Sequence, residues 1–215
     1  MKRTLPLLIL AIFLFLPGCA TVETLNFGYP APPAGTAEKE FSYRDFQGVF
    51  HVHSRYSETS EGYFDEIGRA AQKTHADFVI VSDHNTLKPL REKMEGFYGP
   101  VLILVGTELV TREGHLLVLG IDRELDWEAP LEENLKKILD QGGLGFVAHG
   151  ALRRSPWLDW DLAPLTGMEV YSFAEDFSRP PEPWLMTKAM ALPPRAFFKS
   201  ALREPVENLR RWDSI

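Results

Sequence analysis

The sequence has a single cysteine, Cys19, so no disulfide can form within the chain. It also has no excess of positive charge, because 23 lysines and arginines face 30 aspartates and glutamates and the formal net charge is -7. A chain this acidic repels phosphate backbones, so no nucleic acid is expected among its partners. Long hydrophobic runs are missing after residue 18. The overall hydrophobic content of 45% is nevertheless sufficient for a core.

One short apolar run lies at the N-terminus. Lys2 and Arg3 precede "LPLLILAIFLFLP", which is shorter than a bilayer requires, and "GCA" follows. The pattern predicts a signal peptide over residues 1–18. "LPGC" resembles the bacterial lipobox, which implies lipidation of Cys19; ordinary secretion with an incidental cysteine is the alternative. We therefore expect an exported protein, lipid-anchored to a bacterial membrane on its periplasmic or cell-surface side.

The rest of the chain divides into a tether and one domain. Residues 19–45 include the Pro-, Gly- and Ala-rich "GYPAPPAGTAEKE", which predicts a flexible tether. From residue 46 to residue 215, short apolar runs alternate with helical patterns. Strands are expected within 48–53, 77–84, 101–108, 115–120, 144–149 and 167–171, and helices within 61–74 and 130–143. Their nearly continuous apolar character predicts parallel strands in an α/β barrel or a doubly wound sheet.

Histidines are few, six in the whole chain, yet five of them stand at the margins of these strands. His51 and His53 are two residues apart, so on a strand both side chains leave the same face. The other strand-margin groups are Asp83, His84, Glu108, His115 and His149. In an α/β barrel the carboxyl ends of the strands converge, so these groups are expected to meet. Imidazoles with carboxylates suit Zn²⁺, Mn²⁺ or Fe, and the grouping predicts a multi-metal hydrolytic site.

Each of these residues also has a structural interpretation. A strand histidine such as His115 is often a hydrogen-bonded core residue, and Glu108 could pair with an arginine. Asp83 could cap a turn, orient a ligand histidine or serve as the general acid of a hydrolytic reaction. Glu169, in "GMEVY", is expected to support the ligands or the structure rather than to bind a metal. The pair His51 and His53 is harder to explain without a metal, because two buried imidazoles need partners.

Four segments together resemble the polymerase and histidinol phosphatase (PHP) domain of metal-dependent phosphoesterases. They are "HVHSRYSETSEG", "VSDHNT" (with Ser82 where the family has Thr), "GTELVTREGHLLVLG" and "GFVAHG". Their order and spacing match over residues 48–172. The resemblance implies a distorted (β/α)7-type barrel that binds two or three divalent ions.

The resemblance also assigns residues to the site. Metal ligands are implied at His51, His53, His84, Glu108, His115 and His149. A further ligand is expected at Glu58, with Glu61 as a rival.

One family feature is missing from the sequence, which has no Asp-x-His pair after Glu169. The expectation is a barrel incomplete at its C-terminal end, in a chain cut before its last ligands; a naturally smaller site is the alternative.

The function implied is hydrolysis of a small phosphate ester by a metal-activated hydroxide. Arg55, Arg112, Arg153 and Arg154 lie near the expected ligands in sequence and are candidates for binding the phosphate, although each could instead be a solvated surface residue.

Two other classes of function stay open. One is an amidohydrolase acting on C–N or C–O bonds, many of which use a carboxylated lysine from a strand. The other is a non-catalytic metal-binding lipoprotein.

Overall fold

The computed structural model describes residues 44–161, 165–178 and 184–214. The predicted signal peptide, Cys19 and nearly all of the tether lie outside the described residues. The strands are β1 (Gly48–Val52), β2 (Phe78–His84), β3 (Gly96–Tyr98), β4 (Val101–Val110), β5 (His115–Leu119), β6 (Leu144–Ala148) and β7 (Gly167–Met168). The helices are α1 (Phe64–Lys73), α2 (Lys88–Arg91), α3 (Leu131–Asp140), α4 (Phe173–Ser178), α5 (Leu185–Ala191), α6 (Pro194–Ala201) and α7 (Val206–Trp212).

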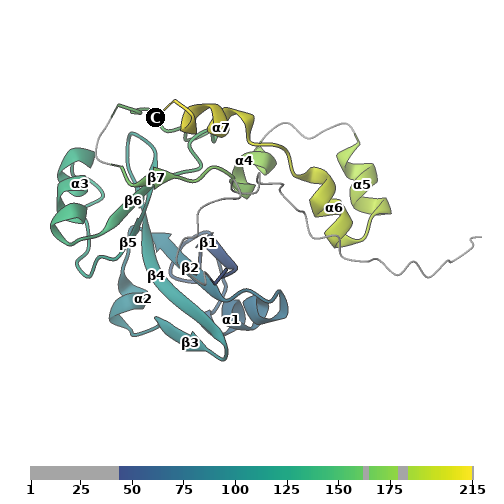
Figure 1. Ribbon diagram of the computed structural model, residues 1–215, viewed down its shortest axis with the longest axis horizontal. Coiled ribbons are helices and arrows are strands. Elements are labelled where there is room, and N and C mark those ends of the chain that lie inside the picture. Colours follow the sequence, from purple (N-terminus) through teal and green to yellow (C-terminus); the bar gives the residue numbers. More distant parts are fainter. Residues whose placement is uncertain (1–43, 162–164, 179–183, 215) are drawn as a thin grey trace, which may run out of the picture. The chain divides into compact units, whose positions relative to one another are not determined.

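The described strands form one curled sheet in a mixed α/β fold (Figure 1). Its order is β1-β2-β4-β5-β6-β7, and β3 pairs with β4 outside this path. β1, β2 and β4 run parallel, and β6 and β7 are also parallel to each other. β4 is the longest strand, with 10 residues, and pairs with β2, β3 and β5. The curl places the ends of several strands around one polar site.

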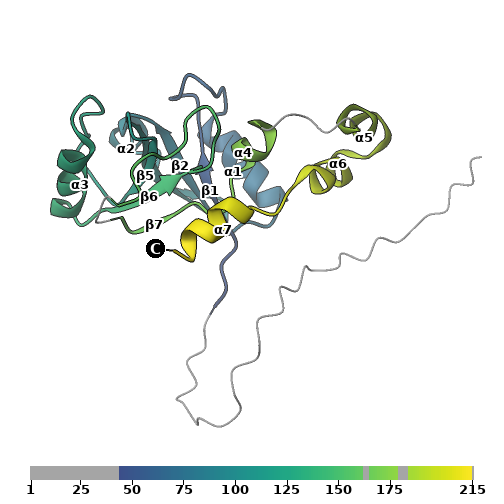
Figure 2. The same cartoon turned by 90° about the horizontal axis from the view of Figure 1, so that it is seen from above.

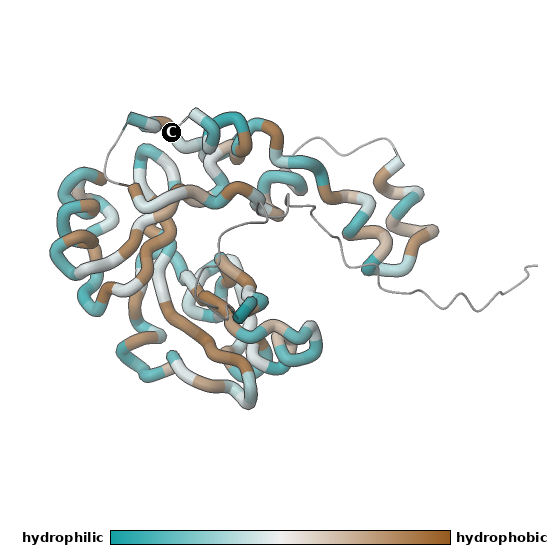
Figure 3. Tube along the Cα trace, viewed as in Figure 1, coloured by the Kyte–Doolittle hydropathy of each residue, from teal (hydrophilic) through white to brown (hydrophobic). Residues whose placement is uncertain are grey.

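Helices α1 and α3 cover different parts of this sheet. Phe64 and Ala71 of α1 pack with Val79, Val81 and Ile103 of β2 and β4, and all five side chains are buried. Figure 2 shows α3 at the other end of the sheet, where it joins a second apolar cluster. That cluster contains Leu109, Leu116, Leu131, Leu135, Ile138, Val147 and Trp157. The apolar stretches of β2 and β4 are visible as brown segments in Figure 3.

The parallel arrangement predicted for all strands is wrong at β5. β5 pairs antiparallel with both β4 and β6. The reason is the short link between β4 and β5: the four residues 111–114 can close a hairpin but are too few for a crossover helix. The Thr111 hydroxyl donates to the Gly114 carbonyl at 2.7 Å and stabilises this turn. In the part of the chain that the structure describes, no helix has the length and apolar composition needed to cross a bilayer.

Candidate metal centre

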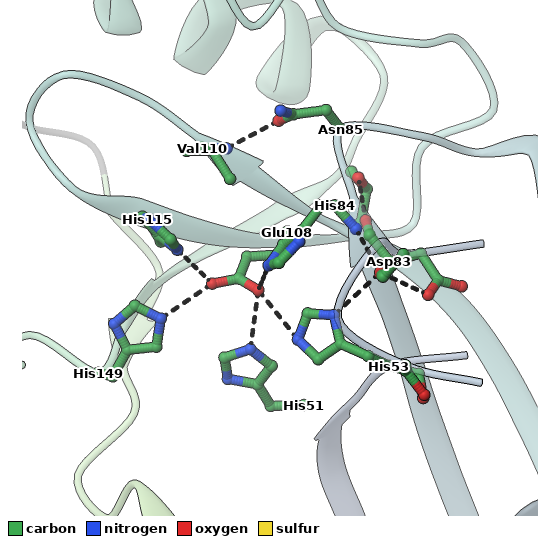
Figure 4. A network of polar contacts seen from close by, with 12 residues as sticks. His51, His53, Asp83, His84, Asn85, Glu108, Val110, His115 and His149 are labelled. Carbon is green, nitrogen blue, oxygen red and sulfur yellow. Dashed lines mark hydrogen bonds and ion pairs between the residues drawn. The ribbon is translucent and has the colours of Figure 1, made fainter. Parts of the chain in front are cut away.

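Glu108 of β4 lies at the middle of a cluster of imidazoles (Figure 4). Its side chain is 1% exposed, and five of the six histidines contact its two oxygens. Oε2 lies 3.0 Å from His51 Nε2, 3.1 Å from His53 Nε2 and 3.0 Å from His84 Nε2. Oε1 lies 2.6 Å from His115 Nδ1 and 2.9 Å from His149 Nε2. The structure therefore brings together groups that are up to 98 residues apart in sequence, between residues 51 and 149.

Strand register places three of these side chains on one face of the sheet. His84 of β2 is directly opposite Glu108 of β4 in the parallel pair. His115 of β5 is opposite Val110, which is two residues after Glu108 and so has the same facing. The other face of β4 carries Val105, which packs toward α1. Side chains alternate between the two faces along β4. This alternation directs the apolar residues of β4 to the core and Glu108 into the site.

An irregularity in β1 turns His51 and His53 toward the face of the sheet that carries Glu108. Val49 pairs with Val79, but Val52 pairs with Val81, so the register shifts by one residue between them. His51 has φ of 66, in the left-handed region that a non-glycine residue rarely occupies. This bulge sends Val52 toward the apolar core and both histidines toward Glu108. His149 also has a positive φ, 28. Strained backbone at two of the five histidines is typical of a functional site.

Hydrogen bonds alone do not satisfy this arrangement. Three imidazole nitrogens point at Oε2 of Glu108, which has only two lone pairs. His51 contacts Glu108 through Nε2 and Glu169 through Nδ1, so both nitrogens would have to carry protons. A cation bound by Glu108 and the imidazoles would remove the crowding at Oε2 and would replace the proton on His51 Nε2. Ligand atoms at about 2.0–2.2 Å from one ion lie about 3 Å apart, the separation found here.

The donors form two groups that could each hold an ion, and they share Glu108. One consists of His51, Glu108 and His149, and the other of His53, His84 and Glu108. Within each group the ligand atoms lie within 4.8 Å of one another. Two imidazoles and one carboxylate oxygen leave open positions on a four- to six-coordinate ion, as in catalytic rather than structural sites. The donor set fits divalent Zn, Mn or Fe.

Asp83 supports the second group from behind. Its Oδ1 accepts the Ser54 N–H at 2.8 Å and the Ser57 hydroxyl at 2.7 Å, and its Oδ2 accepts the Ser54 hydroxyl at 2.6 Å. Ser57 Oγ in turn lies 3.0 Å from His53 Nδ1 and accepts the backbone N–H of His84 at 3.0 Å. Asp83 therefore fixes the loop after β1 and, through Ser57, both histidines of the group.

Glu169 supports the first group. Its Oε2 lies 3.3 Å from His51 Nδ1 and accepts the backbone N–H of His149 at 2.7 Å. The Nδ1 atom of His149 is buried and has no hydrogen-bond partner among the described residues. A buried polar atom of this kind needs an explanation, and a solvent molecule or ligand at the site provides one.

The charges of the two carboxylates dominate the electrostatics. Burial alone would lower the pKa of His51, but hydrogen bonds and charge from Glu108 and Glu169 outweigh it and raise that pKa to about 9. Burial alone would raise the pKa of Glu108, but hydrogen bonds from His115, His149 and His51 hold it well below its usual range. Without metal, His51 is therefore protonated at neutral pH, and an ion must displace that proton to bind.

The stability of the metal-free protein is expected to fall as the pH rises through this range. The folded-state pKa of His51 lies above its ordinary value of 6.5, so its stabilisation is complete below pH 6.5 and is lost as the pH rises through about 9. The loss is expected to be about 3 kcal/mol. Urea unfolding of the chelated protein below pH 6.5 and above about pH 9 measures this loss of stability. His51→Gln, which cannot titrate, should flatten the difference; an unchanged profile in that variant contradicts the assignment.

None of the remaining predicted site residues belongs to the two donor groups found among the described residues. Glu58 and Glu61 are exposed, and neither belongs to the donor groups found among the described residues. Arg112, Arg153 and Arg154 are also exposed. Arg55 lies over the Tyr63 ring, with 4.8 Å between its guanidinium carbon and the ring centroid. The loop at residues 53–62 turns back on itself, since Arg55 N–H donates to the Gly62 carbonyl, and this leaves its glutamates facing solvent.

Sequence reasoning missed a buried polar link from α7 to the His149 loop. Asn208 is 2% exposed, and its side-chain N–H donates to Glu175 at 2.8 Å. Glu175 is itself buried and accepts the backbone N–H of Ala151, two residues after His149, at 2.9 Å. Burial raises the pKa of Glu175, while the Ala151 and Asn208 donors oppose the rise. Nothing in the local sequence around Asn208 signals this long-range contact.

Asn208→Ala is expected to weaken metal binding at the first group by about tenfold, because Glu175 then loses its anchor beside His149. The second group should bind with unchanged affinity. Calorimetric titration of chelated protein with Zn²⁺ resolves the two. Asn134→Ala is a matched control, since it removes another buried amide, which donates to the Asp126 carbonyl on the α3 side. Equal losses in the two variants would show that Asn208 only stabilises the fold.

The chain matches known proteins over part of its length. No family model matches the chain. An uncharacterized protein of Methanocaldococcus jannaschii is 30% identical over 111 residues, which covers 46% of this chain and 64% of that protein. A solved two-domain protein of Bacteroides vulgatus, described as containing a predicted PHP-like metal-dependent phosphoesterase, is 16% identical with a TM-score of 0.38. That match covers 51% of this chain and 36% of the other. The chain thus spans less than two thirds of either protein.

Fold and site together define a mixed α/β protein with a histidine and glutamate cluster suited to divalent metal ions.

Proposed function

We propose that this protein is a metal-dependent hydrolase that cleaves small phosphate esters. The observation that carries the proposal is Glu108, one buried carboxylate shared by two histidine groups. A carboxylate shared by two histidine groups would let the site hold two ions, the combination used for in-line displacement at phosphorus. Bound there, divalent ions would supply Lewis acidity and lower the pKa of a coordinated water to about 7.

The other tasks of the site fall to residues of the chain. Glu108 would serve both donor groups and would offset part of the positive charge of the bound ions. His53, His84 and His115 have side chains 19%, 28% and 18% exposed, whereas His149 is 6% exposed. The substrate therefore approaches on the side of these three histidines. Asp83 is 1% exposed and already accepts three hydrogen bonds, so it orients its neighbours and is not positioned to donate a proton.

The amidohydrolase alternative loses support from the strands. That class commonly bridges its metals with a carboxylated lysine on a strand, and none of the seven described strands contains a lysine. A non-catalytic metal-binding role has no comparable structural feature in its favour, because each donor group leaves ligand positions open.

The test is to chelate the purified protein, reload it with Zn²⁺ or Mn²⁺, and assay hydrolysis of a nitrophenyl phosphate, an amide and a lactone. We expect metal-dependent hydrolysis of the phosphate ester and its loss with chelator. Hydrolysis of the amide or lactone alone would instead establish the amidohydrolase class. Tight metal binding without any hydrolysis would overturn catalysis and leave the binding role.

A further inference from the structure

The segment from Trp184 to Arg203, which includes α5 and α6, differs from the rest of the chain in charge. It contains four basic residues and no acidic residue, whereas the whole chain has a net charge of -7. The basic residues are Lys188, Arg195, Lys199 and Arg203. The segment thus carries a net positive charge within an acidic protein.

The same segment exposes large apolar side chains. Neither α5 nor α6 contains a buried residue. Met186 and Met190 are one helical turn apart on α5 and are 74% and 87% exposed, and Trp184, just before the helix, is 69% exposed. Figure 1 shows α5 and α6 as neighbouring helices, and residues of the two are in contact. These side chains add nothing to the two buried clusters of the sheet.

On α6 the cationic and apolar groups share one face. Arg195, Phe198 and Lys199 of α6, with Leu202 directly after the helix, recur at intervals of three and four residues, so they lie on one side. All four are exposed, Phe198 and Leu202 by 44% and 45%, and the Phe198 ring also contacts Phe173 of α4 with 5.8 Å between ring centroids. Phe197 on the other side is only partly exposed. A face on which cations flank apolar groups is typical of helices that lie in a lipid interface.

We propose that residues 184–203 dock onto an anionic lipid surface. Apolar groups would enter the headgroup boundary, and Arg195 and Lys199 would extend to the lipid phosphates, as long cationic side chains do at interfaces. A second copy of this chain would bring like charges together on this face, and an RNA or DNA partner would leave the methionines uncovered. The proposal is independent of the metal centre and of the function proposed for it.

The experiment measures Trp184 itself, because residues 1–43 would give any anchored chain membrane affinity of their own. Full-length protein is mixed with vesicles of brominated phosphatidylcholine, with and without phosphatidylglycerol. The fluorescence quenching that is lost in Trp184→Phe reports contact of this segment with lipid. We expect this quenching on the anionic vesicles. In the Arg195→Glu/Lys199→Glu variant, half-saturation should require a lipid concentration that is higher by about tenfold or more.

Lys136→Glu/Lys137→Glu on α3 is the matched control, since it changes the same number of exposed charges elsewhere and should leave the Trp184 signal unchanged. Absence of Trp184-dependent quenching on both kinds of vesicle would overturn the proposal and point to a protein partner. Equal quenching with and without phosphatidylglycerol would overturn the role assigned to the cations, as would an equal effect of the two charge reversals.

Discussion

Glu108→Gln is expected to weaken metal binding at both donor groups and, with it, to slow hydrolysis. The substitution keeps the size of the side chain but removes the charge that both groups share. It also turns an amide N–H₂ toward imidazole nitrogens that now face a carboxylate. We expect each ion to bind at least about 100-fold more weakly, and the rate to fall by about a thousandfold, which corresponds to about 4 kcal/mol of lost transition-state stabilisation.

Single-histidine variants separate the two groups, whereas Glu108→Gln affects both. His149→Ala should weaken only one of the two binding events seen by calorimetry, and His84→Ala only the other. Glu132→Gln, an exposed glutamate in the first turn of α3, is the matched control and should bind both ions. A Glu108→Gln protein that keeps one ion at wild-type affinity would show that the carboxylate is not shared.

Asp83→Ala is expected to lower the free energy of unfolding of the metal-free protein by about 3–5 kcal/mol. The reason is that Asp83 accepts hydrogen bonds from buried donors. Ser54 is 0% and Ser57 is 4% exposed, and three donors from these residues would lose their acceptor. Metal binding at the His53 and His84 group should weaken as well, because Ser57 contacts both histidines.

Urea unfolding with chelator present measures the free energy of unfolding of the metal-free protein. Asp83→Asn keeps one acceptor oxygen and should cost less than Asp83→Ala, about 1–3 kcal/mol. Asp122→Ala, at an aspartate whose side chain is 85% exposed, should be within about 0.5 kcal/mol of wild type. A similarly small effect of Asp83→Ala would contradict the structural role assigned to it.

Much of the sheet could be predicted from the sequence because alternation is a local signal. The apolar run of β4 and the facing of Glu108 near its end follow from a period of two that the neighbouring residues fix. The helical stripes of α1 and α3 fall within the ranges predicted for them. The antiparallel pairing of β5 was not predicted, because the periodicity of "HLLVLG" is the same in both orientations.

The site depends on longer-range contacts, and this decides which of its parts the sequence reveals. Histidines at strand margins are visible as a pattern, and five of them do surround Glu108. Glu58 was predicted as a ligand from its place in a motif; its side chain is exposed in the loop after β1, and its metal-binding role stays a prediction. Ser57 and Asn208 act through hydrogen bonds to residues 26 and 33 positions away, which no local pattern signals.

The most direct test of a shared carboxylate is the electron paramagnetic resonance spectrum of chelated protein titrated with Mn²⁺. If Glu108 joins two ions, the spectrum at full loading should show exchange coupling between them, and Glu108→Gln should lack it. A spectrum that shows only isolated Mn²⁺ at every loading would contradict the account.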